Sequence, residues 1–176
     1  MNHQARGIDH VGLTVPDIEI AERFLIDGLG AELIYETLSA EDEPLRGPEV
    51  ERVVRLPAGA EINLIRMYKM GTGPGIELFQ YTVDDQRPPA RGSDLGWQHV
   101  ALYVDDLEEC AARAIRAGAV RLNLPWNLMN AERGDGNRFC FVSTPFGALL
   151  ELVTFPSPQA YESTTLLRRW KPPSSG

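Results

Sequence analysis

The stretch Ile8-Asp9-His10-Val11-Gly12-Leu13-Thr14-Val15-Pro16-Asp17 decides the fold of this chain, because the same pattern occurs a second time. Its counterpart is Trp97-Gln98-His99-Val100-Ala101-Leu102-Tyr103-Val104-Asp105-Asp106, in which His99 aligns with His10 and Asp106 with Asp17. Such a repeat indicates one structural unit used twice. Apart from His3, near the N-terminus, these two histidines are the only ones in the chain, and any functional interpretation must explain their matching positions.

The first copy has the pattern of a βαβββ module. Alternating apolar residues and β-branched side chains predict a strand over 8–15. Asp17 is a typical helix N-cap, and the glycines at 28 and 30 end the helix that follows it. The remaining segments are expected to be strands at 31–38, 60–68 and 76–83, an acidic loop at 39–48 and a short helix at 49–56.

The second copy repeats this order. A strand is expected over 97–104, a helix over about 107–117, and further strands over 119–122, 138–143 and 148–155, with a long loop over 123–137. The predicted domains are a first module at 7–83, a linker at 84–96, a second module at 97–155 and a C-terminal arm at 156–176. The apolar side chains of Leu166, Leu167 and Trp170 predict that the arm packs on another surface, for which a partner subunit is one candidate.

Composition narrows the class of protein. The net charge of −8 argues against nucleic acids and acidic membranes as partners, because both attract basic proteins. No apolar run is long enough for a transmembrane helix, and the N-terminus lacks the apolar segment of a secretory signal. Cys110 and Cys140 are isolated, as expected for reduced thiols in a cytoplasmic protein.

The last strand of each copy carries a glutamate inside an apolar run. These are Glu77 in Gly75-Ile76-Glu77-Leu78-Phe79 and Glu151 in Leu149-Leu150-Glu151-Leu152-Val153. A buried carboxylate is costly unless it is paired or ligates a metal ion. We therefore expect the four residues His10, Glu77, His99 and Glu151 to converge on one metal ion if the two copies pack about a pseudo-twofold axis.

A simpler interpretation exists for each residue alone. A single strand histidine is more often hydrogen-bonded in the core or at the surface, and a single strand glutamate is more often solvated. The matching pair in both copies favours the metal site. Two imidazoles and two carboxylates suit a first-row divalent ion, and Zn²⁺, Ni²⁺, Co²⁺, Mn²⁺ and Fe²⁺ all remain candidates.

With these motifs, the chain resembles the vicinal oxygen chelate superfamily, which includes glyoxalase I, methylmalonyl-CoA epimerase, extradiol dioxygenases and fosfomycin or bleomycin resistance proteins. The resemblance covers residues 7–155, and the further matching segments are Gln98-His99-Val100-Ala101 and Thr144-Pro145-Phe146-Gly147-Ala148-Leu149-Leu150-Glu151-Leu152. It implies an α+β fold in which two tandem βαβββ modules form a curved mixed sheet around a metal-binding cleft. Segments near 77–94 and in the C-terminal arm also resemble a bacterial subgroup that includes the valiolone epimerases.

The resemblance implies an isomerase, epimerase or lyase acting on a small oxygenated carbonyl compound, either a hydroxyketone or a 2-oxoaldehyde adduct, through a metal-stabilised enediolate. Glu151 or Glu77 would be the catalytic base, with Glu151 favoured by analogy alone. The expected partners are this small-molecule substrate and a second copy in a homodimer. The cleft can form within one chain or across the dimer, since family members use both arrangements.

Substrate contacts are predicted at four residues outside the metal set, namely Arg66, Tyr103, Trp126 and Arg138. Trp126 and Arg138 belong to a long segment of the kind that often forms lids or binding loops, although an ordinary solvated loop is an equal alternative. Two other functions stay open: a non-catalytic binding protein of the resistance type, and an Fe²⁺ extradiol-type dioxygenase. No residue points to a glutathione site.

Overall fold

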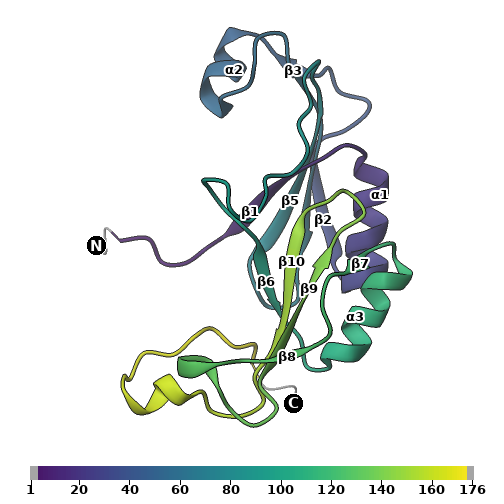
Figure 1. The fold of residues 1–176 in the computed structure, drawn as a ribbon. Coiled ribbons are helices and arrows are strands. Elements are labelled where there is room, and N and C mark those ends of the chain that lie inside the picture. Colours follow the sequence, from purple (N-terminus) through teal and green to yellow (C-terminus); the bar gives the residue numbers. More distant parts are fainter. Residues whose placement is uncertain (1–3, 174–176) are drawn as a thin grey trace. The chain divides into compact units, whose positions relative to one another are not determined.

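The computed structural model describes residues 4–173, and its contacts divide the chain into two compact units (Figure 1). One unit comprises the chain up to Glu22 together with Gly30–Arg87, and the other comprises Arg23–Leu29 together with the chain from Pro88 onward. Each unit contains one five-stranded mixed sheet. The predicted α+β class and the two tandem modules are therefore confirmed.

The first unit contains the elements β1 (His10–Val15), α1 (Ile18–Arg23, whose last residue belongs to the other unit), β2 (Glu32–Leu38), β3 (Leu45–Arg46), α2 (Pro48–Val54), β4 (Glu61–Lys69) and β5 (Gly75–Thr82). Its sheet has the order β1-β5-β4-β2, with β3 paired to β4. The strands β1 and β5 are parallel, whereas β4 runs antiparallel to both β5 and β2. The first and last strands of the module therefore lie side by side.

Alternation along β1 and β5 separates this sheet into two faces. The face under α1 is apolar, with Val15 and Leu78 fully buried. The same face carries Gln80, whose Oε1 accepts a hydrogen bond of 2.8 Å from the backbone N–H of Ile18 at the start of α1. The other, open face carries His10, Gly12 and Thr14 from β1 and Glu77, Phe79 and Tyr81 from β5.

Gly75 permits the close approach of β4 to β5 beside the start of β1. A Cβ atom at this position would lie 3.0 Å from Met67 Sδ, 3.0 Å from the Tyr68 carbonyl oxygen and 3.6 Å from His10 Cβ. His10 is the register partner of Gly75 in the parallel pair. A side chain at residue 75 would therefore crowd Met67 and the Tyr68 backbone on β4, and it would also contact His10.

The second unit contains η1 (Phe24–Gly28), β6 (Val100–Tyr103), α3 (Leu107–Arg116), β7 (Val120–Arg121), β8 (Trp126–Asn127), η2 (Asn130–Glu132), β9 (Arg138–Ser143), β10 (Leu149–Thr154) and η3 (Ala160–Ser163). Its sheet has the order β6-β10-β9-β7, with β8 paired to β9. This order matches that of the first unit, and β6 and β10 are again parallel. The repeated sequence pattern thus corresponds to a repeated strand topology.

Helix α3 covers one face of the second sheet through its contacts with β9 and β10. The residues of α3 that are buried are Leu107, Ala111 and Ala114, which recur at helical spacing. Fully buried Val142 and Leu152 belong to the two strands beneath the helix. The main core of this unit therefore lies between α3 and its sheet, and a second buried cluster of Leu128, Val153 and Phe155 covers part of the opposite face.

The two modules keep the predicted order of elements, with differences in short segments. The predicted loop at 39–48 contains β3, and the predicted loop at 123–137 contains β8 and η2. Each of these strands has two residues and pairs with a longer neighbour, so it is too short to show periodicity in the sequence. Within residues 4–173, no helix combines the length and apolar character needed to cross a membrane.

The part of the C-terminal arm that the structure describes packs on its own unit. The Nζ of Lys171 donates a hydrogen bond of 3.1 Å to the Phe155 carbonyl oxygen. The guanidinium group of Arg169 lies 5.0 Å from the centroid of the Phe155 ring and pairs with the carboxylate of Glu132. Leu166 and Leu167 remain exposed, so the packing of this arm on a partner subunit stays a prediction.

Asp106 is the N-cap of α3, and its contribution to the stability of the fold can be tested. Asp106 Oδ1 accepts a hydrogen bond of 3.0 Å from the Glu109 backbone N–H, as Asp17 Oδ1 does from Ile20 at 2.9 Å. We expect Asp106→Ala to lower the free energy of unfolding by about 1 kcal/mol, because an orphan N–H loses its acceptor. Urea denaturation measures this, with Asp105→Ala as the matched control. Equal stability of both variants would contradict the capping role.

Candidate metal centre

In each unit, a histidine faces a glutamate on the last strand; His10 begins β1, and His99 directly precedes β6. His10 Nε2 lies 3.4 Å from Glu77 Oε2, and His99 Nε2 lies 3.3 Å from Glu151 Oε2. The parallel register explains this placement, because Glu77 is opposite Gly12 and Glu151 is opposite Ala101, each two residues beyond the histidine. Gly12 and Ala101 are small, so both carboxylates have space above the sheet.

The other ring nitrogen of each histidine is held by the residue that precedes it. His10 Nδ1 lies 2.7 Å from Asp9 Oδ2, and His99 Nδ1 lies 3.0 Å from Gln98 Oε1. The Gln98 amide is oriented by its own nitrogen, which donates a hydrogen bond of 2.8 Å to the Gly92 carbonyl oxygen. Because these side-chain oxygens can only accept, Nδ1 carries the proton in a neutral ring and Nε2 presents its lone pair to the glutamate.

Asp9 and Gln98 are candidate supporting residues of the site that the sequence did not indicate. Partners of this kind fix the ring orientation and the tautomer of metal-binding histidines. The available signal was a side chain with an acceptor oxygen directly before each histidine of the repeat. That signal is weak by itself, because neighbours along a strand point to opposite faces and only the structure shows the hydrogen bonds.

Burial and charge set the electrostatics of the two pairs. The side chains of both glutamates are only 17% exposed. The hydrogen bond to Asp9 raises the pKa of His10 above its ordinary value, burial lowers it, and the negative charge of Glu77 adds to the increase. Each pair places an imidazole nitrogen beside a carboxylate, an arrangement that a proton or a cation between them would stabilise.

The structure brings the four candidate metal ligands together as two separate pairs. Within residues 4–173, no three or more His, Cys, Asp or Glu side chains form a metal-binding group. The structure brings His10 to Glu77 in the first unit and His99 to Glu151 in the second. The sequence-based prediction that all four residues bind one ion stays a prediction.

Two of the four predicted substrate contacts share the sheet face of Glu151. The register places Glu151 opposite Phe141, so Phe139 lies on that face as well. The Trp126 ring packs edge-on against Phe139 at 6.1 Å, and the Tyr103 ring packs edge-on against Phe155 at 4.8 Å. The open face of the second sheet is therefore strongly aromatic.

The two predicted arginines lie on other faces. Arg66 is on the helix-covered side of β4, because its neighbour Met67 is the register partner of Glu77. Its side chain is 13% exposed and forms ion pairs with Glu19, Glu22 and Glu36 at 2.8, 3.1 and 3.2 Å. Arg138 precedes Phe139 on β9 and so points away from the face of Glu151. We therefore leave both arginines out of the proposed site.

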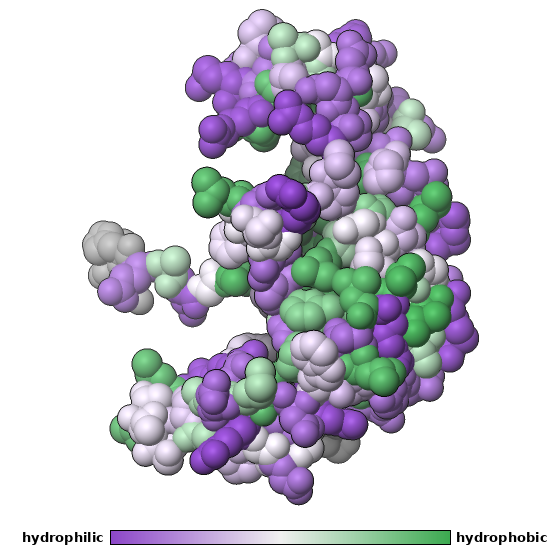
Figure 2. All heavy atoms as spheres, viewed as in Figure 1, coloured by the Kyte–Doolittle hydropathy of each residue, from purple (hydrophilic) through white to green (hydrophobic). Residues whose placement is uncertain are grey.

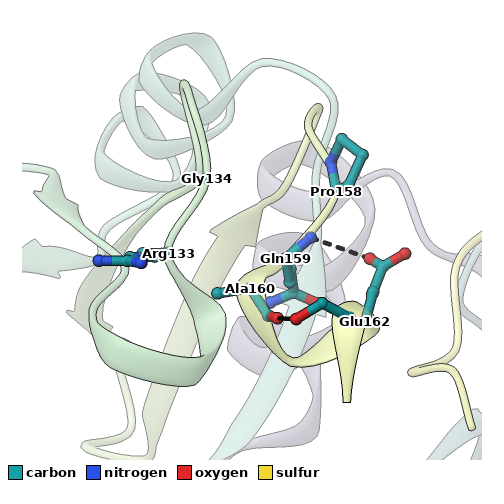
Figure 3. Close-up of a pocket in the computed structure, with 7 residues that line it drawn as sticks. Arg133, Gly134, Pro158, Gln159, Ala160 and Glu162 are labelled. Carbon is teal, nitrogen blue, oxygen red and sulfur yellow. Dashed lines mark hydrogen bonds between the residues drawn. The ribbon is translucent and has the colours of Figure 1, made fainter. Parts of the chain in front are cut away.

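A cavity of about 660 Å³ lies in the second unit, between the loop after η2 and the C-terminal arm (Figure 3). Its lining residues are Arg133, Gly134, Pro158, Gln159, Ala160, Glu162 and Ser163. The carboxylate of Glu162 accepts a hydrogen bond of 2.9 Å from the Gln159 backbone N–H and pairs with Arg168. None of the candidate metal ligands lines this cavity.

A second cavity, of about 450 Å³, lies in the first unit at the end of its open face. It is lined by Thr14, Val54, Arg55, Leu56, Pro57, Ala60, Tyr81, Val83, Asp85, Gln86 and Arg87. Burial raises the pKa of the Tyr81 phenol, the Thr14 hydroxyl partly offsets this effect, and the charge of Glu77 adds to it. This cavity therefore adjoins the face that carries the His10–Glu77 pair, and no local sequence pattern predicted it.

Comparison with known proteins identifies relatives of this chain in sequence and in structure. A relative in an Actinomyces species, named 2-epi-5-epi-valiolone epimerase, is 33% identical over 174 residues, which cover 97% of this chain and 91% of that protein. A glyoxalase family protein from Bacillus cereus has a similar structure, with a TM-score of 0.66 and 20% identity over 86% of this chain and 95% of that one.

A fosfomycin resistance protein from Listeria monocytogenes, whose crystal structure holds Mn(II) and 1S,2S-dihydroxypropylphosphonic acid, has a TM-score of 0.57 and 15% identity. The match covers 92% of this chain and all (100%) of that protein. The sequence profile of the Glyoxalase/Bleomycin resistance protein/Dioxygenase superfamily matches residues 9–141. The chain therefore belongs to this superfamily, the vicinal oxygen chelate superfamily that its motifs resemble.

Proposed function

We propose that this chain is a divalent-metal-dependent isomerase or epimerase acting on a small hydroxyketone. The observation that carries the proposal is the pair of histidine Nε2 and glutamate Oε2 atoms, 3.4 Å apart in one unit and 3.3 Å apart in the other. The relative named as an epimerase, at 33% identity over nearly the whole chain, supports the reaction class. The superfamily supports a small molecule as the substrate.

The geometry of each pair fits two ligands of one ion. Metal–nitrogen and metal–oxygen bonds are about 2.0–2.2 Å long, so neighbouring ligands at tetrahedral or octahedral angles lie roughly 3.0–3.5 Å apart. The observed separations fall in this range, and they exceed the usual length of an N–H···O hydrogen bond. Neutral imidazole and carboxylate are suitable ligands for Zn²⁺, Ni²⁺, Co²⁺, Mn²⁺ or Fe²⁺.

The candidate residues have different roles in the proposed reaction. A bound divalent ion supplies Lewis-acid polarisation of the substrate carbonyl group. Either Glu77 or Glu151 accepts a proton from the carbon next to that carbonyl, and return of the proton to the other side of the same carbon inverts its configuration. Asp9 and Gln98 keep the histidine rings oriented throughout. Partial burial of both glutamates keeps water away from the base.

Metal content is the first test. We expect protein purified without chelator to contain about one equivalent of a first-row divalent metal per chain, and both His10→Ala and His99→Ala to lose it, because each removes a nitrogen ligand. Elemental analysis measures this, and circular dichroism verifies that the variants stay folded. If each variant retained half of the metal, the two pairs would bind separate ions. An absence of metal in the wild type, even after reconstitution, would favour the binding-protein alternative.

Substitution of the two glutamates tests whether a carboxylate is the catalytic base. We expect Glu→Gln at either residue 77 or residue 151 to keep the metal but reduce exchange of the substrate α-proton with solvent by about 10²- to 10⁴-fold, because a carboxamide is not a base. Deuterium incorporation into hydroxyketones, followed by NMR, measures the exchange. Glu41→Gln, in an exposed loop, is the matched control. Unimpaired exchange in both active-site variants would exclude a carboxylate base.

The hydrogen bond from His10 to Asp9 predicts a pH effect in the metal-free protein. Asp9 raises the pKa of His10 because the carboxylate stabilises the imidazolium ion. Asp9→Asn should therefore lower the pKa, so that His10 loses its proton at a lower pH than in the wild type. NMR titration of the imidazole resonances measures this shift. Asp135→Asn should leave the titration unchanged, and an unchanged curve for Asp9→Asn would contradict the assigned hydrogen bond.

A further inference from the structure

We infer that the linker between the two modules positions His99, with Gly92 and Gln98 as positioning residues. The inference rests on the proposed function, because it takes His99 to be a metal ligand, and it adds a role for the linker beyond joining the modules. Hydrogen bonds lead from a turn at Arg91 through the Gly92 carbonyl group and the Gln98 amide to the imidazole ring. All of these residues belong to the second unit.

The linker turn is held by its own hydrogen bonds. The Arg91 backbone N–H donates to Asp94 Oδ2 at 2.8 Å, and the Asp94 backbone N–H donates to the Arg91 carbonyl oxygen at 2.9 Å. The Arg91 guanidinium group also pairs with the Asp94 carboxylate at 2.9 Å. Residues 84–98 are exposed, and Figure 2 shows hydrophilic and hydrophobic side chains together over the loop that leads into β6 in Figure 1. The turn therefore depends on these local hydrogen bonds and not on packing against a core.

Gly92 allows the Gln98 amide to lie directly against the backbone of this turn. The Nε2 of Gln98 donates a hydrogen bond of 2.8 Å to the Gly92 carbonyl oxygen. A Cβ atom at residue 92 would lie 2.8 Å from the same Nε2 and 3.5 Å from two carbon atoms of the Gln98 side chain. Glycine is the residue that permits so close an approach to a backbone. Any larger residue at position 92 would therefore displace the Gln98 amide.

The Gly92 carbonyl group decides which end of the Gln98 amide meets the histidine. A carbonyl oxygen can only accept a hydrogen bond, so the amide nitrogen must face Gly92 and the amide oxygen is left for His99. That oxygen lies 3.0 Å from His99 Nδ1 and also can only accept, so it holds the ring proton at Nδ1. The lone pair of Nε2 is then directed to Glu151, whose Oε2 is 3.3 Å away.

An aromatic contact restrains the same imidazole ring from the sheet. The rings of His99 and Phe141 meet edge to face, with centroids 5.3 Å apart and an angle of 83° between their planes. Phe141 is also the register partner of Glu151, so it lies beside both members of the pair. The ring is therefore fixed by a hydrogen bond at Nδ1 and by packing against Phe141.

The first histidine has a looser support. The Asp9 side chain that accepts the hydrogen bond from His10 is 94% exposed, and the His10 side chain is 40% exposed, against 27% for His99. A solvated carboxylate has more rotational freedom than an amide anchored at a backbone carbonyl group. The linker thus supports one histidine of the two, and a substitution at Gly92 should affect His99 but not His10.

The tautomer of His99 in the metal-free protein is the first measurement. Long-range proton–nitrogen NMR spectra, recorded at a pH at which the rings are neutral, distinguish a proton on Nδ1 from one on Nε2. We expect the Nδ1–H tautomer in the wild type and a mixture of tautomers in Gly92→Ala, because the displaced amide no longer holds the proton. The His10 signals should stay unchanged. Gly7→Ala is the matched control, since a Cβ atom there would meet no atom of residues 4–173 within 4 Å apart from its chain neighbours.

The affinity for Co²⁺ is the second measurement, made by competition with a chelator. We expect Gly92→Ala and Gln98→Ala each to weaken binding by about tenfold, the effect typical of losing a group that orients a metal-binding histidine. If Gly92 acts through Gln98, Gly92→Ala should cause no further loss when it is combined with Gln98→Ala. Melting temperatures verify that each variant is folded.

The outcomes separate this inference from the proposed function. An Nε2–H tautomer of His99 in the wild type, or identical spectra for the wild type and Gly92→Ala, would overturn the inference. Additive losses of Co²⁺ affinity in the double variant would also overturn it, because Gly92 would then act by another route. So would a change of tautomer that leaves the Co²⁺ affinity intact. A change of tautomer in a protein whose wild type binds no Co²⁺ would support the positioning of His99 and reject the metal-dependent function.

Discussion

The structure depends on the parallel pairing of the first and last strands in each module. Parallel neighbours cannot be joined by a tight turn, so the chain must travel through a helix and further strands before it returns beside its start. This return brings Glu77 next to the strand of His10, and Glu151 next to the strand of His99. Two residues distant in sequence therefore become neighbours on one sheet face, and every intervening element serves as the connection.

Burial of a carboxylate is energetically costly, and this cost explains why a cation would stabilise each histidine–glutamate pair. Both glutamates lie largely out of water, where a lone negative charge is unfavourable. A neutral imidazole whose proton is held at Nδ1 cannot by itself neutralise that charge. The arrangement is favourable once a cation bridges the two groups, and this is the physical basis of the metal proposal. The hydrogen bonds that the histidine rings donate to Asp9 and Gln98 orient the rings for such a role.

The two faces of the first sheet hold very different ionic groups. On the helix-covered face, Arg66 is surrounded by three glutamates, and the Tyr68 hydroxyl donates to the carboxylate of Glu22. These contacts satisfy the buried charge internally, so Arg66 has a structural role in fastening α1 and β2 to the sheet. On the open face, the one ion-pair partner of Glu77 among residues 4–173 is His10. The charge of Arg66 is balanced by its ion-pair partners and belongs to the structural framework. The charge of Glu77 is not balanced by a permanent cation, and this marks the candidate site.

Much of the fold was determined by the sequence alone. The repeated strand-and-cap pattern around His10 and His99 predicted two βαβββ modules, because periodicity and capping are local properties that short segments express directly. The glutamates were identified because a charge in an apolar run contradicts its local pattern. The very short strands β3 and β8 were missed, since they exist only through pairing with longer neighbours.

Tertiary structure decided the contacts that no local pattern specifies. It placed Arg66 away from the face of Glu77 and Arg138 away from the face of Glu151, since a one-residue change in alternation moves a side chain to the other side of a sheet. It also showed the hydrogen bonds of Asp9 and Gln98 and the cavity between α2 and the 85–87 segment. Strand register and the convergence of distant segments depend on the packing of the entire module. For that reason the sequence predicted the candidate ligands, and the structure was needed to find the residues that hold their rings and the cavity beside them.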